Sequence, residues 1–391
     1  MAFPLAAVAD QMIAKLAAAT GAQALTQLDG ATLLGERAML NGMAIPGRTA
    51  AGGGCRLFDA LGDTIALNLS RGADRELLPA LFETDELDVN DQASIAARIA
   101  HSDAAALVLR GRSMGLAIAA ECESLPVAAS PCVELVAGCP AAAEKHRVPR
   151  ILDLSSLWAG PLAAHLLWLA GAEVVKVESR TRPDAMRWGD EVFYALLNQG
   201  KASVVLDFTD TNDRQALLTL IGDSDIVIEA ARPRALAQLG IDAAQIVRAT
   251  PGLVWLSITG HGAEGEASGW VGFGDDCGVS GGLSAALRAA CGRTGFVGDA
   301  IADPLTGMLA ALVAWEGWSS RLGGRFALAM SHVVAHGVAA ARNENPAAWE
   351  SGLKAWNANV GKPFPSVNRR PIGALSAFGQ QTRECLERVG R

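Results

Sequence analysis

The stretch Ile151-Leu-Asp-Leu-Ser-Ser-Leu-Trp-Ala-Gly-Pro161, followed by Ala172-Glu-Val-Val-Lys-Val177, indicates the fold class of this chain. Its first four residues have the short apolar pattern of a buried strand, and residues 172–177 repeat that pattern. The apolar segment 159–169 between them opens with Gly160-Pro161 and predicts a helix. A strand, a helix and a second strand in this order predict a unit of a parallel sheet.

The same alternation continues toward the C-terminus. Further strands are predicted at 203–208, 225–229 and 253–258, and a helix at 211–221. This order favours an α/β fold, a Rossmann-like open parallel sheet with helices on both faces. Such sheets bind ligands beyond the carboxyl ends of their strands. Those ends fall at 155–159, 178–182, 229–234 and 259–262.

A carboxylate stands at the start of another predicted helix. Asp303 precedes Pro304, and the apolar run 308–315 follows with helical periodicity. Aspartate at the N-cap and proline at the first helical position are a strong helix-start signal. The segment by itself allows two interpretations, because Asp303 either only caps this helix or also acts as a nucleophile.

The rest of the chain divides into two further segments. Residues 1–145 are predicted to form a small α+β domain with a glycine turn at 52–54 and a hairpin of strands 55–58 and 64–69. Residues 146–342 form the predicted large domain. Residues 343–391 are a polar, Pro-rich tail that ends in a candidate helix, 380–389, and returns to the large domain.

Composition limits the classes of function. The chain has 391 residues and a net charge of −8, and an acidic chain without a basic cluster argues against nucleic acid as a partner. The apolar runs are shorter than the roughly 20 residues of a membrane span. The N-terminus lacks the basic region of a signal peptide, and the seven cysteines form no CxxC pair. We therefore expect a reduced, cytoplasmic protein without a metal site, because its six histidines are dispersed as well.

These motifs, taken in order, resemble class III CoA-transferases, the family of formyl-CoA and carnitine CoA-transferases and α-methylacyl-CoA racemases. The opening strand–helix–strand unit matches, as do Asn198-Gln-Gly-Lys-Ala-Ser203, Asp225-Ile-Val-Ile-Glu-Ala-Ala-Arg-Pro-Arg234, Ser257-Ile-Thr-Gly-His-Gly262 and Asp303-Pro-Leu-Thr-Gly307. Each motif is weak alone, but their shared order is specific. The resemblance covers roughly residues 149–340. In the family the small domain usually follows the large sheet, whereas here it comes first, as in a permuted member.

The resemblance implies covalent chemistry at Asp303. In the family the matching aspartate attacks an acyl-CoA thioester, forms a mixed anhydride, and then carries CoA as a thioester until a carboxylic acid collects it. The glycine loop is implied to donate backbone N–H groups to the oxyanion and to cover the site. Two acidic residues fall where the family has a Tyr-Asp, Tyr-Glu or His-Asp pair. The residues implied to be catalytic are Asp303, Asp275, Asp276, Gly52, Gly53 and Gly54.

The resemblance also implies how CoA is bound. CoA and acyl-CoA are expected as substrates, with no permanently bound cofactor, and the family implies an interlocked homodimer. Trp158 would make the wall of the site bulkier than usual, and Ala230-Ala231 replace an Asn-Phe pair. The implied CoA-binding residues are Leu157, Trp158, Ala159, Arg180, Arg182, Lys201, Ala230, Ala231, Arg232 and Arg234.

Three functions remain open at this point. The first is an acyl-CoA:carboxylate CoA-transferase. The second is an isomerase or racemase that removes the proton α to the thioester, although the histidine of the racemase pair is missing. The third is a non-catalytic CoA-binding protein, which the departures at Trp158, Ala230 and Ala231 would allow.

Overall fold

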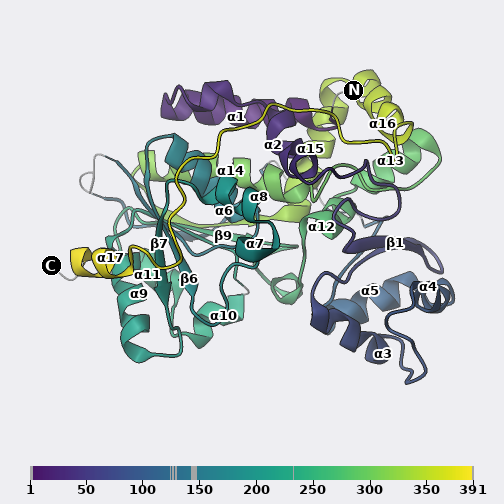
Figure 1. Ribbon diagram of the computed structural model, residues 1–391, viewed down its shortest axis with the longest axis horizontal. Coiled ribbons are helices and arrows are strands. Elements are labelled where there is room, and N and C mark those ends of the chain that lie inside the picture. The colour runs from purple at the N-terminus through teal and green to yellow at the C-terminus, as the bar shows by residue number, and fades with distance from the viewer. Residues whose placement is uncertain are drawn as a thin grey trace.

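The computed structural model describes residues 3–123, 125, 127, 130–141, 148–231 and 233–389. Its main sheet has seven strands in the order β4-β10-β9-β8-β5-β6-β7 (Figure 1). Six strands are parallel, and β4 joins the edge antiparallel to β10. The strands are β4 (Cys132–Ala137), β5 (Arg150–Asp153), β6 (Glu173–Ser179), β7 (Ala202–Leu206), β8 (Ile226–Glu229), β9 (Val254–Thr259) and β10 (Gly324–Ala329).

Both faces of this sheet are covered by helices. In β8, Ile226 and Ile228 pack in one hydrophobic cluster and Val227 packs in another, because successive side chains of a strand point to opposite faces. The predicted Rossmann-like open sheet is therefore confirmed. One face carries α1 (Ala6–Thr20), α2 (Gly30–Leu40), α6 (Ala159–Leu169), α8 (Glu191–Asn198) and α14 (Ala302–Ser319), and the other carries α9 (Thr211–Asp223) and α11 (Ala243–Ala249) (Figure 1).

A second, antiparallel sheet has the order β1-β2-β3. The predicted hairpin is confirmed, since Cys55 pairs with Asn68 and Asp59 with Thr64. The elements are β1 (Cys55–Asp59), β2 (Thr64–Asn68), β3 (Ala117–Ala120), α3 (Leu78–Leu81), α4 (Gln92–Ala100) and α5 (Ala104–Ser113). One face of this small sheet packs on the helices α3, α4 and α5. The other face contacts Val279 and Phe296, which lie in the chain between β9 and α14.

The remaining helices connect or flank these layers. Within the described part of the chain, no helix combines the length and the apolar composition needed to cross a membrane. The remaining helices are α7 (Met186–Gly189), α10 (Pro233–Gln238), α12 (Gly274–Ser280), α13 (Leu283–Cys291), α15 (Met330–Glu344), α16 (Pro346–Asn357) and α17 (Thr382–Val389), with short 3₁₀ turns η1 (Leu25–Gln27), η2 (Gly72–Leu77) and η3 (Glu266–Gly269).

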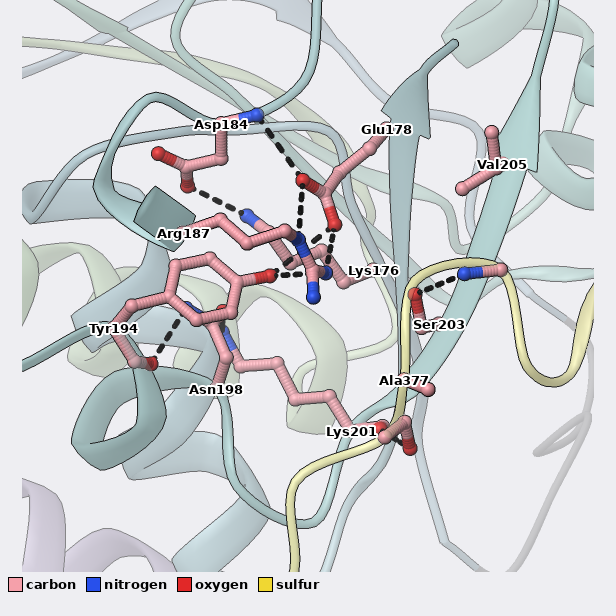
Figure 2. Close-up of polar contacts among 12 residues, drawn as sticks. Lys176, Glu178, Asp184, Arg187, Tyr194, Asn198, Lys201, Ser203, Val205 and Ala377 are labelled. Atoms are coloured by element: carbon pink, nitrogen blue, oxygen red, sulfur yellow. Dashed lines mark hydrogen bonds and ion pairs between the residues drawn. The ribbon is translucent and has the colours of Figure 1, made fainter. Parts of the chain in front are cut away.

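The C-terminal tail runs back along the large sheet and covers its edge strand β7 (Figures 1 and 2). The N–H of Gln381 donates to the Ser203 carbonyl at 3.0 Å, and the N–H of Val205 donates to Thr382 Oγ1 at 3.0 Å. A covered edge removes unpaired strand groups that would otherwise recruit another chain. The predicted terminal helix is present as α17, and Cys385 and Leu386 pack against the sheet's second cluster.

Two contacts bear on the predicted domains. Helix α1 packs on α14, where Trp315 Nε1 donates to the Ala19 carbonyl at 3.0 Å. Strand β4 also belongs to the large sheet. Parts of the predicted small domain, 1–145, thus lie with the large sheet, and the division into three domains remains a prediction.

Candidate active site

A cavity of about 230 Å³ opens at the carboxyl ends of β5, β8, β9 and β10, where the fold predicts a ligand. A larger cavity of about 720 Å³ lies between α13, α15 and α16, but none of its lining residues belongs to the loops that follow β5, β8 and β9. We assign the site by its chemistry rather than by its size. The smaller cavity is lined by Arg71, Ser156, Leu157, Ala159, Gly160, Ala230, Ala231, Ile258, Thr259, Gly260, Ser268, Trp270, Val271, Gly272, Phe273, Asp303 and Met330.

Asp303 is the one carboxylate on the cavity wall among the described residues. The predicted cap is wrong by two positions, because α14 begins at Ala302 with Ile301 as its N-cap, so Asp303 lies inside the first turn. Its carboxylate is therefore not used as the N-cap. Burial raises its pKa to about 7, against the charge of Arg37 and a hydrogen bond from the Ala159 N–H, which both lower it. Asp303 thus faces the first turn of a second helix, α6.

Helix α12 packs against Asp303 through a glycine. A Cβ on Gly274 would lie 2.1 Å from Oδ2 of Asp303 and 2.4 Å from the Ala300 carbonyl. Only a residue without a side chain allows this approach. The next residue, Asp275, accepts a hydrogen bond from the Ala300 N–H at 3.0 Å, which ties α12 to the loop before α14.

The two predicted acidic partners do not line the cavity. Burial and the charge of Asp299 raise the pKa of Asp275 to about 7. Asp276 is fully buried, and it accepts hydrogen bonds from the Phe273 N–H at 3.1 Å and from Asn68 Nδ2 at 3.3 Å. The structure places both carboxylates behind the wall, where they hold backbone and neighbouring side chains.

The loop after β5 forms another wall of the cavity. Leu157 has φ +68°, a left-handed conformation that is unfavourable for a residue with a Cβ. Its N–H lies 3.2 Å from each oxygen of Asp184. Asp184 in turn pairs with Lys176 at 3.2 Å (Figure 2). The Lys176 ammonium also donates to the Ser155 carbonyl at 2.8 Å. A buried ion pair therefore holds the strained loop in place.

Trp158 departs from its expected place on the CoA wall. Its ring is buried against the edge of Phe193 at 4.9 Å, and the guanidinium of Arg37 lies 5.3 Å from the ring centre. It does not line the cavity. The aromatic residues that do line it are Trp270 and Phe273.

Lys201 does not face the cavity either. Its ammonium donates to Asp153 Oδ2 at 2.8 Å, the Pro161 carbonyl at 2.9 Å and Asn198 Oδ1 at 3.0 Å, which uses all three of its hydrogens. Burial lowers its pKa to about 8. In place of the expected phosphate contact, the Lys201 ammonium forms an internal link between β5, α6 and α8.

The predicted phosphate-binding arginines lie at different places. Arg180 and Arg182 are exposed in the loop after β6 and lie outside the cavity lining. A third arginine nearby in the chain, Arg187 of α7, instead pairs with Glu178 and donates to the Tyr194 hydroxyl at 2.6 Å (Figure 2). Arg234 belongs to α10, Arg232 lies outside the described residues, and the expected contacts at Ala230 and Ala231 do line the cavity.

The glycine loop is not brought to Asp303. Gly52, Gly53 and Gly54 line a separate cavity of about 460 Å³ on the small sheet. A Cβ on Gly52 would lie 2.9 Å from Arg37 Nη2, so the loop touches the arginine that interacts with the acidic residues rather than the cavity itself. Its role as an oxyanion donor stays a prediction.

Two features of the site were missed in the sequence. Arg71 follows the second strand of the small sheet, and its guanidinium lies 5.8 Å from the Phe273 ring centre. No local motif marks Arg71, because it reaches the cavity only through packing of the small sheet against the large one.

The second feature is a buried cluster of three possible metal ligands. The ligand atoms of His261, Asp276 and Cys277 lie within 4.8 Å of one another. The Cys277 thiol, however, donates to the Gly260 carbonyl at 3.3 Å, and burial raises its pKa well above the usual value.

Comparison with known proteins shows what part of the chain is similar to. Residues 149–318 match the model of CoA-transferase family III. A succinyl-CoA–D-citramalate CoA-transferase of Chloroflexus aurantiacus is 31% identical over 172 residues, which are 42% of this chain and 43% of the relative. A formyl-CoA:oxalate CoA-transferase of Afipia carboxidovorans is 29% identical over 177 residues, 42% of this chain and 40% of the relative.

A solved structure of Rv3272 from Mycobacterium tuberculosis is 27% identical and covers 52% of this chain and 57% of its own, with a TM-score of 0.45. The chain spans less than half the length of the two curated relatives described above. The resemblance to CoA-transferase family III that the sequence predicted is thus confirmed over residues 149–318.

Proposed function

We propose that this chain is a CoA-transferase that moves CoA from an acyl-CoA to a carboxylic acid, with Asp303 as the nucleophile. The observation that carries the proposal is the Asp303 carboxylate on the wall of a cavity at the carboxyl ends of parallel strands. The match to CoA-transferase family III supports the substrate class. CoA enters as a substrate, and no resident cofactor takes part in the proposed reaction.

In the first half of the proposed reaction, an Asp303 oxygen attacks the thioester carbonyl carbon. The C–S bond breaks, CoA leaves as its thiolate, and an aspartyl–acyl anhydride remains. The thiolate then attacks the aspartyl carbonyl carbon, which releases the original acid as a carboxylate and leaves an aspartyl-CoA thioester. No redox change and no net proton transfer occur.

The second half runs the same steps with the acceptor. The acceptor carboxylate attacks the aspartyl thioester and expels CoA thiolate, which then attacks the acyl carbon of the new anhydride. The products are the new acyl-CoA and free Asp303. The Ala159 N–H and the positive end of α6 favour negative charge on the oxygens involved.

The cavity walls suit an acyl group with apolar parts. Leu157, Ile258, Phe273 and Met330 supply apolar surface, and Arg71 is the one cation on the wall among the described residues. Arg180 and Arg182 remain proposed contacts for CoA phosphates, since they lie exposed beyond the end of β6. An interlocked homodimer belongs to the same proposal.

Trapping tests the covalent step. Acyl-CoA with hydroxylamine should convert Asp303 to a hydroxamate, because both proposed intermediates are activated acyl derivatives of its side chain. Trypsin releases residues 294–321 as one peptide that contains both Asp299 and Asp303. Fragment spectra must therefore place the label on Asp303, and D303N should show none.

One feature favours a second candidate, an isomerase in which Asp303 removes the proton α to the thioester. A carboxylate whose pKa is raised to about 7 is also suited to act as a general base. Turnover of an acyl-CoA with exchange of its α-hydrogen into deuterated water and no hydroxamate would favour the isomerase. Binding of CoA in calorimetry without turnover of any acyl-CoA would favour the non-catalytic alternative.

A further inference from the structure

The small sheet carries a cavity of its own, of about 460 Å³, beside the glycine loop. It lies between β1, the end of β2, η2 and α4, and it shares no lining residue with the Asp303 cavity. The two cavities are neighbours along the chain, since Ser70 lines this cavity and the next residue, Arg71, lines the Asp303 cavity. Neither the proposed reaction nor the family match at 149–318 uses it.

This cavity is positively charged in an acidic protein. Two arginines, Arg56 and Arg75, line it, and no lining residue is acidic. Within the described part of the chain, neither arginine forms an ion pair. The Nε of Arg56 is buried without a hydrogen-bond partner, and an unpaired buried donor is costly. In a chain of net charge −8, an acceptor from outside the protein would satisfy this group.

The other groups of the cavity favour a small organic anion. Arg75 Nη1 donates to the Val89 carbonyl at 2.8 Å, which anchors one arm of that guanidinium. Its other N–H groups can donate to a ligand. Gln92 and Ser70 add polar groups. Apolar surface comes from Phe58, Leu67, Leu69 and Ile95.

The glycines shape one wall. A Cβ on Gly54 would lie 2.1 Å from Ser70 Oγ, and Gly53 has φ +77°, so the loop approaches Ser70 only because it lacks side chains. Glycine at these positions brings the backbone close to whatever occupies the cavity. This gives the glycine loop a use that does not depend on Asp303.

We propose that this cavity binds a small organic anion, whose carboxylate or phosphate group pairs with Arg56 and Arg75 and whose apolar part lies on Phe58 and Ile95. Guanidinium groups recognise both kinds of oxyanion through paired N–H···O bonds. The proposal does not rest on the reaction at Asp303.

The site is linked to the Asp303 cavity by hydrogen bonds. Ser70 Oγ donates to Asn68 Oδ1 at 2.5 Å, and Asn68 Nδ2 donates to Asp276 Oδ1 at 3.3 Å. Asp276 accepts the N–H of Phe273, which lines the Asp303 cavity. An anion in this cavity would therefore contact Ser70, the first residue of the hydrogen-bond series that ends at Phe273 in the Asp303 cavity.

Calorimetry tests the proposal with two probes, succinate for a carboxylate and ADP for a phosphate, each titrated at low and high salt. We expect saturable binding of at least one probe, and weaker binding at high salt because the attraction is electrostatic. R56Q should weaken that binding about tenfold or more, since a hydrogen bond to a charged group is lost. R56K should keep part of it, because the charge remains without the planar fork.

Two variants serve as controls. R98Q removes the same charge from an exposed position on α4 outside the cavity and should change affinity by less than about twofold. D303N should also leave the binding intact, which separates this site from the Asp303 cavity. Equal melting temperatures of R56Q and R98Q would show that both variants are folded. Absence of saturable binding at about 10 mM, or equal affinity of R56Q and R98Q, would overturn the proposal.

Discussion

Arg37 Nε lies 3.1 Å from Oδ2 of Asp299, and this contact joins the N-terminal helix α2 to the loop that precedes α14. Asp299 is completely buried, whereas Arg37 keeps 19% of its side chain exposed. Among the charges that act on Asp299, Arg37 is the one that lowers its raised pKa. The same guanidinium lowers the pKa of Asp303 and of Asp275. One cation thus offsets three acidic residues, the buried Asp299 and the half-buried Asp275 and Asp303.

R37M should destabilise the protein, because Asp299 would be left as a buried charge without its partner. Loss of one member of a buried pair costs about 3–5 kcal/mol, and the partial exposure of Arg37 favours the lower end. Urea unfolding at pH 7 measures the loss. The double variant R37M/D299N should recover most of it, since neither charge remains. If R37M and the double variant are equally unstable, the pairing is not what stabilises this region.

The trapping reaction should depend on pH through Asp303. Only the ionised carboxylate attacks a thioester, and its pKa is raised to about 7, first by burial. The rate of labelling should therefore rise with pH and level off above about 7. Asp275 titrates in the same range, so the measured midpoint belongs to the coupled group. A rate already constant at pH 5 would show that Asp303 ionises normally.

Stability should follow the same titration with the opposite sign. In the folded state Asp303 keeps its proton up to a higher pH than in the unfolded chain, so the unfolded chain binds fewer protons between about pH 4 and 7. The free energy of unfolding therefore falls as pH rises through this window. D303N removes the part of this dependence that belongs to Asp303 and leaves that of Asp275. The stability of D303N relative to wild type should therefore be greater at pH 8 than at pH 5 in paired urea titrations.

G274A should disturb the active site more than a similar change one turn later. A Cβ at 274 would lie 2.1 Å from Oδ2 of Asp303, and this contact must displace either the carboxylate or α12. G278A in the same helix meets only Ile301 Cγ2 at 3.5 Å, an ordinary contact, and alanine favours the helix. We expect loss of Asp303 labelling in G274A and near wild-type labelling in G278A. Equal labelling of the two variants would contradict the observed approach.

K201M and R180Q should separate structural from ligand-binding basic residues. K201M leaves Asp153 buried without its cation and should cost about 3–5 kcal/mol of stability, with little change in CoA affinity of the folded protein. R180Q alters an exposed side chain and should change stability by less than about 0.5 kcal/mol. A weaker affinity for CoA in R180Q, measured by calorimetry, would support its proposed phosphate contact. A stable K201M with weak CoA binding would reverse these assignments.

Much of the large sheet could be predicted because its signals are local. Strands such as β5 and β8 read as short apolar runs, and their order between helices specifies a parallel sheet. The cavity at the strand ends follows from that topology, and Leu157, Ala159, Ala230 and Ala231, which the family resemblance implies as CoA contacts, line it. β4 was not predicted, because an edge strand far from the parallel units in sequence pairs with β10 only through long-range contacts.

Side-chain direction explains why two of the predicted CoA contacts do not line the cavity. Trp158 and Lys201 stand in the expected segments, but their side chains turn into the core, where Phe193 and Asp153 are their partners. Motif position indicates where a backbone lies and not which way a side chain points. Arg71 shows the reverse case, since it lines the cavity without any motif of its own.

Periodicity and motif order are properties of neighbouring residues. The alternation of strands and helices, the family resemblance over roughly residues 149–340 and the candidate nucleophile Asp303 could therefore be predicted from the sequence alone. Folding was needed to show that α2 brings Arg37 to Asp299, that Gly274 admits the Asp303 carboxylate, and that the glycine loop faces a cavity with Arg56 and Arg75. These relationships join residues that lie far apart in the chain, and packing of the two units sets the distances between them.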